Sequence, residues 1–572
     1  MPTAQAAPTV TPKLTINGAA ATEALVCLLT ELVLDDSVSL PDMLDLTFAD
    51  GNGGFHETSP FKIGAKVKVE LKASGQPATT FEGECVSLGA SYHAGRFQAT
   101  VRAFDVSHRL NRGRMTKTYE QMTASDVFGR VIQEHGLSKG TVENTTVTFP
   151  HLTVANETPF AFLHRLAAEN GLEAVAADNK MHLRKPESKA EPIVLNPGGT
   201  LVSLDIEISA ADQVKDVKVT GWDPKQKKEI VGAAVVGTKA AKINSTPDAL
   251  STKMGTTKKL VIGGLAIETQ AHATAVAKAT AEQHGSAFAD VRGTVSGHTG
   301  LRAGTTIRLE GVGKDLAGTF VVSSTRHVWN QSGYVTEFTV SGQQDRSLGG
   351  LVQGRASDTS PRSLSGVVTA IVTDNKDPDS TGRVRVALPW LDAEHVSGWA
   401  RVSYPGAGPE RGMTFLPEVN DEVLVAFHHG NPGRPVVIGG LYNGKDKFPD
   451  HKGAGHTDRG KTVHRGLFTD QHKLAFVDKA GEEAITLGLR DKSYQITLDK
   501  KGTVISIGSD GKVDVKAKSG VTITAVSGNI ELVAKAGDVK IGGMNVTVEG
   551  KAGLTLSASG MAKLKGATVA IG

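Results

Sequence analysis

The last 72 residues repeat a short pattern that restricts their fold more than any other part of the chain. Residues 501–572 contain 13 Gly but no Phe, Tyr, Trp, Pro or Arg. Alternation with a period of two predicts strands with one buried face, and the glycines between them predict sharp corners. After a first pair at Val504 and Ile507, the alternating apolar residues recur about every eight positions, at Val513, Val515, Val521, Ile523, Ile530, Leu532, Val539, Ile541, Val546, Val548, Leu554, Leu556, Val569 and Ile571.

One copy of this repeat cannot make a stable core. Each strand offers only two or three aliphatic side chains, and a single layer of such strands leaves long unpaired edges. Three copies wound around one axis would bury the aliphatic residues and pair the edges, while residues such as Thr522 and Lys535 face water. The sequence therefore predicts a homotrimeric, intertwined triangular β-helix, a needle, over residues 501–572.

The region before the needle divides into shorter parts. Residues 364–446 contain five short strands separated by Gly/Pro turns, which is typical of a small barrel of the OB type. A Gly/Ser-rich stretch at residues 346–363 predicts a linker. Residues 447–500 are interpreted as a connector and the start of the needle.

The first 345 residues mix strands with helical stretches and predict an α+β region. Helices are expected at Ser125–His135, with Ser125 and Asp126 as cap candidates, and at Thr158–Asn170, where Pro159 suits the first turn. The apolar run Ala19–Leu34 contains two glutamates and no preceding basic stretch, so it is interpreted as a helix of a soluble domain rather than a membrane segment. The fold class is mainly β, with an α+β N-terminal hub-like region.

Three stretches of sequence resemble a known family. DDSVSLPDMLDLTFAD, VRAFDVSHRLNRGRMTKTYEQMTASDVFGRVIQEHGL and NETPFAFLHRLAAENGLE resemble the hub half of VgrG and phage late-control spike proteins. GVVTAIVTDNKDPDSTGRVRVALPWL and FLPEVNDEVLVAFHHGNPGRPVVIGGLYNG are similar to the OB barrel of phage baseplate spikes. Together with the repeat, this resemblance covers nearly the whole chain.

The resemblance implies a structural spike of a contractile injection system that helps pierce a target envelope. The implied partners are two further copies of the chain, inner tube and baseplate proteins, cargo effectors, and transiently the target membrane. A PAAR-type cap protein is expected at the tip, at Ile571 and Gly572. The architecture fits both type VI secretion systems and phage-tail-like injection systems. In either case the spike is expected to assemble in the bacterial cytoplasm and to act at the envelope or in a released particle. Because the chain ends in strand register, no fused effector is expected.

Composition and motifs narrow the functional classes. The 63 Lys and Arg nearly balance the 60 Asp and Glu, which argues against nucleic acid as a partner. Two cysteines, Cys27 and Cys85, suit a reducing cytosol. Because the sequence has no phosphate-binding loop, no Gly-x-Ser-x-Gly elbow and no Cys/His nucleophile pair, neither enzymatic activity nor a cofactor is expected.

Three groups of polar residues imitate catalytic or metal sites. Asp374, Asp377 and Asp379 are spaced much as in a calcium loop but lack its final Glu, and are interpreted as a turn. The set Glu418, Asp421 and Glu422 is interpreted as a turn and an outward strand position rather than a glycosidase pair. The histidines at 451, 456, 464 and 472 are spaced too loosely for a typical metal site within one chain. One His from each of three chains could still supply three metal ligands at a threefold axis. The rival functions are a spike-borne cell-wall-degrading enzyme and a trimeric adhesin or polysaccharide-binding fibre.

Overall fold

The structure is a computed structural model of the chain, and it divides into two compact units, Met1–Phe448 and Pro449–Gly572. It describes residues 10–51, 53–186, 190–223, 226, 228–255, 259–263, 265, 267–342, 366–389, 391, 395–449, 457–502 and 504–571. The predicted linker 346–363 lies outside the described residues. Within the described part, none of the helices is long and apolar enough to cross a membrane.

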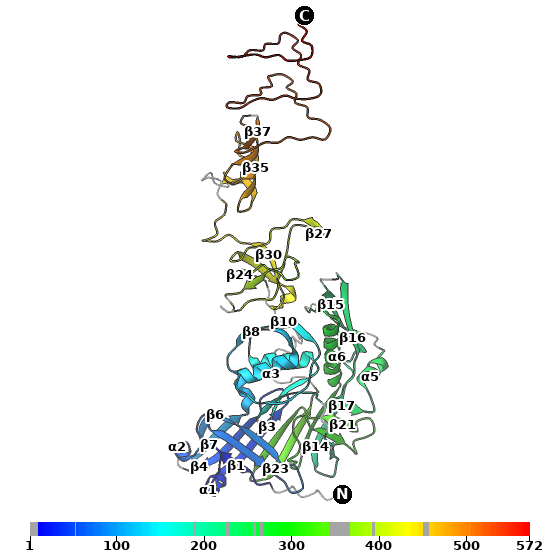
Figure 1. The fold of residues 1–572 in the computed structure, drawn as a ribbon. Helices are drawn as coiled ribbons and strands as arrows, with labels where there is room; N and C mark the ends of the chain where they lie inside the picture. Colours follow the sequence, from blue (N-terminus) through cyan, green and yellow to red (C-terminus); the bar gives the residue numbers. More distant parts are fainter. Residues whose placement is uncertain are drawn as a thin grey trace. The chain divides into compact units, whose positions relative to one another are not determined.

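An 11-stranded sheet dominates the first unit (Figure 1). The strands occur in the order β14-β19-β23-β22-β3-β4-β7-β6-β5-β1-β2. The seven strands from the N-terminal part of the chain are β1 (Lys13–Ile16), β2 (Ala19–Ala20), β3 (Leu29–Ser37), β4 (Met43–Asp50), β5 (Lys66–Leu71), β6 (Thr79–His93) and β7 (Arg96–Phe104). The others are β14 (Leu201–Ile208), β19 (Ala289–Val295), β22 (Ser324–Asn330) and β23 (Gly333–Val340). Antiparallel pairing of β22 with β3 therefore joins two distant segments into one sheet.

The predicted helix at Ala19–Leu34 is wrong for most of its length. Only α1 (Glu23–Cys27) is helical, and the run continues as strand β3. Leu32, Val33 and Leu34 are all buried because β3 lies inside the sheet, where both faces are covered. A strand buried on both faces gives a continuous apolar run, which periodicity alone does not distinguish from a helix.

Both predicted helices of the hub-like region are confirmed. They are α3 (Ala124–Glu134) and α4 (Pro159–Glu169), the second with Thr158 as its N-cap. The N-cap of α3 is Thr123 rather than Ser125 or Asp126, and Asp126 completes a capping box with it. These helices accompany a pair of strands, β8 (Met115–Thr123) and β10 (Thr148–Glu157), and a small sheet of β9 (Lys139–Val142), β11 (Glu173–Ala177) and β12 (Lys180–Arg184).

A third long helix, α6 (Gln270–Ser286), was not predicted from the sequence. It packs on β15 (Asp216–Asp223) and β16 (Lys228–Val235), which form a sheet with β18 (Lys259–Ile262). A Cβ on Gly232 of β16 would lie 2.2 Å from the Ala273 carbonyl oxygen, so glycine is required for this close approach. The remaining elements are the 3-10 turn η1 (Val106–Asn111), α2 (Phe55–Thr58), α5 (Pro247–Lys253) and the sheet β13 (Ile193–Leu195), β20 (Thr306–Leu309), β21 (Gly318–Val321) and β17 (Ala241–Ile243).

A five-stranded sheet forms where the barrel was predicted. Its strands occur in the order β25-β24-β29-β30-β26, and alternate residues such as Ala370, Val372, Val423 and Val425 fill its core. The strands are β24 (Val367–Asp374), β25 (Arg385–Ala387), β26 (Arg401–Val402), β29 (Glu422–Phe427) and β30 (Pro435–Gly440). The hairpin β27 (Ala407–Gly408) and β28 (Arg411–Gly412) and the short turn η2 (His428–Gly430) accompany them.

The second unit begins with the hairpin β31 (Thr457–Asp458) and β32 (Lys461–Thr462) and an antiparallel five-stranded meander. The strands of the meander are β33 (His464–Phe468), β34 (His472–Val477), β35 (Ala484–Leu489), β36 (Tyr494–Asp499) and β37 (Val504–Ser509). Val504 and Ile507, which begin the apolar pattern, therefore belong to the meander, since β37 pairs with β36. Beyond it the chain runs in successive bends (Figure 1).

Candidate assembly surfaces

The apolar residues predicted for the needle core are exposed in a single chain. Their exposure ranges from 53% at Ile530, Val539 and Val569 to 88% at Ile571, and Gly572 lies outside the described residues. No strand forms among the described residues 510–571. One chain thus neither buries these side chains nor pairs these segments, and the β-helix stays a prediction.

The corners of the repeat do occur at regular intervals. Bends fall at residues 518–519, 526–528, 535–537, 544–545, 551–552, 559–560 and 567, with extended segments between them. Of the glycines predicted to turn corners, Gly528, Gly537 and Gly560 lie within bends, whereas Gly520 and Gly550 lie next to them. The segment between the last two bends contains Met561 and Leu564, so the repeat continues there with a different apolar pattern.

The loop that imitates a calcium site is held by an arginine. Arg383 Nη2 lies 2.5 Å from Asp377 Oδ1 and 2.8 Å from Asp379 Oδ2. Asp377 Oδ2 also accepts hydrogen bonds from the backbone N–H and the hydroxyl of Thr381, at 2.8 and 2.7 Å. The hydrogen bonds from Arg383 hold the pKa of the Asp377 carboxyl well below its usual range. Because these donors occupy the carboxylate, the loop is a structural turn.

Two of the three acidic side chains after Pro417, those of Asp421 and Glu422, have structural partners. The Glu418 backbone N–H donates to Asp421 Oδ2 at 2.8 Å, which closes a tight turn. Glu422 lies in β29, where its Oε2 accepts from Asn443 Nδ2 at 2.9 Å. This arrangement agrees with the predicted turn followed by a strand position.

Two of the four histidines of the connector, His464 and His472, lie in the described residues. His464 is buried at the start of β33 and His472 is exposed at the start of β34, whereas His451 and His456 lie outside the described residues. In the part of the chain that the structure describes, no group of three or more His, Cys, Asp or Glu side chains is arranged to hold a metal ion.

A buried charge cluster in the first unit was missed by the sequence analysis. Arg302 Nε donates to Asp36 Oδ2 at 2.8 Å, and its Nη2 to Asp42 Oδ2 at 3.3 Å. The Asp42 backbone N–H donates to Asp105 Oδ2 at 2.7 Å. Burial, together with Asp36 and Asp105, raises the pKa of Asp42. The aspartates lie in two of the stretches that resemble VgrG, but only the fold brings Arg302 to them.

A second set of buried charges lies around helix α4. Arg165 Nη1 donates to Glu169 Oε1 at 3.0 Å and Nη2 to Glu157 Oε2 at 2.9 Å. Glu173 has a weaker partner, since Arg184 Nε lies 3.9 Å from its Oε2. Burial outweighs this attraction and raises the pKa of Glu173 to about 7. These pairs hold the small sheet and the helix layer together.

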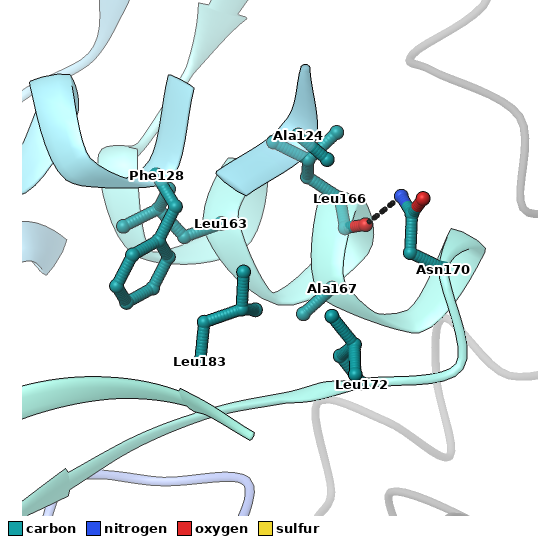
Figure 2. Close-up of a pocket in the computed structure, with 8 residues that line it drawn as sticks. All are labelled: Ala124, Phe128, Leu163, Leu166, Ala167, Asn170, Leu172 and Leu183. Carbon is teal, nitrogen blue, oxygen red and sulfur yellow. Dashed lines mark hydrogen bonds between the residues drawn. The ribbon is translucent and has the colours of Figure 1, made fainter. Parts of the chain in front are cut away.

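The gap between α3, α4 and β12 has no room for a water molecule. Figure 2 shows that its lining is mostly aliphatic and aromatic: Ala124, Phe128, Leu163, Leu166, Ala167, Asn170, Leu172 and Leu183. The amide of Asn170 donates to the Leu166 carbonyl at 2.8 Å, so the polar group in this lining is already bonded within the helix end. The gap is a packing space of the hydrophobic core and offers no polar group for orienting a substrate.

Two family models match successive parts of the chain. The family model described as the Alg8 N-terminal domain matches residues 8–331, more than half of the chain. The type VI secretion system/phage-baseplate injector OB domain matches residues 368–442, which is the five-stranded unit predicted from the sequence.

Curated relatives match over shorter segments. The type VI secretion system spike protein VgrG3 of Vibrio cholerae is 36% identical over 123 residues, which cover 19% of this chain and 11% of that protein. VgrG1a of Pseudomonas aeruginosa is 31% identical over 133 residues, 21% of each protein. The matches thus span only a small part of the length of these relatives.

Solved structures show the same fold over most of the chain. A chain in the lidless PdpA–VgrG complex aligns with a TM-score of 0.52 and 9% identity, over 87% of this chain and 98% of that one. A chain in the lidded Francisella PdpA–VgrG complex aligns with a TM-score of 0.51 and 9% identity, over 87% of this chain and 80% of that one. The chain thus carries the Alg8 N-terminal domain over residues 8–331, and the injector OB domain that follows it, together with the matches to VgrG spike proteins, shows that the chain belongs to the VgrG and phage-baseplate spike family.

Proposed function

We propose that the chain is the structural spike of a contractile injection system and works as a homotrimer. The observation that carries this proposal is the order of the parts. A hub-like region and an injector OB domain precede a segment whose aliphatic residues recur between regular bends and stay exposed in one chain. Such a segment requires further copies to bury its apolar surface.

The needle would then be a prism of three chains. Residues such as Val521 and Ile523 would point to the axis, each worth about 1.5–3 kcal/mol when buried. With strands spaced about 4.8 Å apart, about eight repeats give a needle on the order of 40 Å long. Hydrogen bonds between strands would run along the axis, so the prism would resist compression when an external sheath drives it forward.

The hub is proposed to connect the threefold spike to the inner tube and the baseplate. Two segments of the chain contribute strands to its large sheet. Two similar contributions from each of three chains would provide six near-equivalent surfaces for a sixfold tube. The likeness to VgrG spikes supports this role.

The C-terminal end of the needle is proposed to bind a separate cap protein. Ile571 is 88% exposed in one chain, and three copies of Ile571 and Gly572 would form a small apolar platform. A PAAR-type protein is the proposed occupant, because an uncovered trimer end leaves strand edges bare. Cargo effectors are proposed as further partners, since solved relatives carry PdpA in complex with VgrG.

We propose a mechanical role and no enzymatic activity. The contacts of the Asp377, Asp421 and Glu422 carboxylates support this interpretation, because they give structural roles to three of the acidic residues that imitate sites. One relative is named an actin cross-linking toxin, but the match covers 15% of that protein. Zymography on purified cell wall tests the alternative, because a cleared zone would demonstrate hydrolysis.

The decisive experiment is the mass of the purified full chain in solution by light scattering. We expect a trimer with about three times the 59.9 kDa mass of one chain, and we expect this trimer to persist in denaturant. A monodisperse monomer would overturn the proposal, because one chain leaves the repeat uncovered.

A further inference from the structure

The meander β33–β37 has one face made almost entirely of large apolar side chains. Residues that pair across neighbouring antiparallel strands point to the same face of a sheet. The register links Leu474 with Leu487, Leu487 with Ile496, and Ile496 with Ile507. The second such row begins with Arg465, which is paired with Asp478. In the two rows this apolar face contains Leu467, Leu474, Phe476, Ile485, Leu487, Ile496, Leu498, Ile505 and Ile507.

This apolar face is open in a single chain. Leu487 is 55% exposed, and Ile505 and Ile507 are 73% and 62% exposed. On the same strands the opposite face bears small or polar residues, such as Thr486 and Gln495. Contiguous apolar surface of this kind is rarely left in water and marks an interaction site.

The surroundings of the apolar face indicate further copies of this chain as its occupant. No helix lies in the described residues of the second unit, and the hairpin β31–β32 consists of polar residues, so the described part of the unit offers nothing of its own to cover the face. The sheet also continues directly into residues 510–571, whose exposed aliphatic residues require further copies in the proposed spike. Three chains joined there would bring three identical apolar faces to the same axis.

The meander differs from the later repeat in one respect that determines its role. Every one of its strands pairs with a neighbour in the same chain, so the sheet is complete before chains meet. By contrast, the described residues 510–571 have no strand pairing within the chain. Local hairpins form in about 1–10 μs, whereas an intertwined helix requires three chains already in register.

We propose that the apolar face of the meander is a trimerisation core in its own right, which holds three chains in register before residues 510–571 intertwine. This inference rests on the proposed trimeric spike. Three sheets pack face to face around the axis without threading any chain through another. The meander is then an assembly clamp rather than a passive connector.

The test uses the full chain and two matched double variants. Leu487→Lys with Ile496→Lys places charges on a cross-strand pair of the apolar face, whereas Thr486→Lys with Gln495→Lys places them on the opposite face of the same strands. Each protein is diluted from denaturant, and trimer recovery is followed by light scattering. We expect the first variant to recover trimer at least tenfold more slowly than wild type, and the control to match wild type.

A milder pair separates this effect from loss of the sheet itself. Leu487→Thr with Ile496→Thr keeps residues that favour strands, so an intermediate delay is expected while far-ultraviolet circular dichroism stays unchanged. Equal recovery for wild type and both apolar-face variants would overturn the clamp and leave the spike intact. A wild-type chain that never forms a trimer would overturn the proposed spike function and this inference with it.

Discussion

The nearly isosteric exchange of Val521 for Thr tests whether the repeat faces a shared axis. Val521 is 56% exposed in one chain, so without partner chains the exchange should change the unfolding free energy by at most about 0.5 kcal/mol. In a trimer core it would bury a hydroxyl without a partner, which costs about 1–3 kcal/mol for each copy. Three symmetric copies would therefore lose about 3–9 kcal/mol per trimer.

The neighbouring residue supplies the reverse exchange as a control. Thr522 lies on the other face of the same extended segment, and Thr522→Val adds a methyl where water is expected. The assay is the guanidinium midpoint at which light scattering shows loss of the trimer. A large downward shift for Val521→Thr with little change for Thr522→Val supports the inward assignment. Equal shifts for the two exchanges would refute it.

Three further predictions concern the first unit, which contains all four tryptophans, so their fluorescence reports its unfolding. Arg165→Met should cost about 3–5 kcal/mol, because it leaves two buried glutamates without their cation. The folded state holds the Glu173 proton more tightly than the unfolded chain, so wild type should lose stability as pH rises from about 4.5 to about 7, and Glu173→Gln should flatten this dependence. Burial lowers the pKa of His151 to about 4. The folded protein should therefore lose stability as pH falls from about 6.5 toward 4, by at most about 1.4 kcal/mol per pH unit. His151→Gln should remove that loss.

Each of these predictions has its own control. Arg130→Met breaks an exposed pair with Glu134 and should cost about 0.5 kcal/mol or less; a similar loss at Arg165 would contradict the argument from burial. The two pH effects have opposite signs, so Glu173→Gln and His151→Gln should change the slope of stability with pH in opposite directions. Parallel pH curves for wild type and either variant would show that the residue titrates alike in the folded and unfolded chain.

Local patterns were sufficient to predict several elements of this protein. The caps and periodicity of α3 and α4 placed both helices to within about a residue, because a helix is specified by side chains three and four positions apart. The sequence also predicted the alternating strands of the OB unit and the bends of the repeat, since both depend on near neighbours in sequence. Only the tertiary structure showed that β37 pairs with β36, which assigns the first apolar pair, Val504 and Ile507, to the meander.

Contacts between distant residues were decided by the tertiary structure. The apolar run at Leu32–Leu34 was not recognised as a strand, because its burial depends on its place inside the sheet, where β22 pairs with β3. In the same way, Arg302 reaches Asp36 across 266 positions of sequence, and the apolar face of the meander exists only through the register of five strands. Local patterns in the sequence determined many of the extended, helical and turned segments, because those choices depend on near neighbours, but they did not reveal α6 or the strand β3. The tertiary structure decided which of them meet, because burial and ion pairing depend on residues that the chain brings together only when it folds.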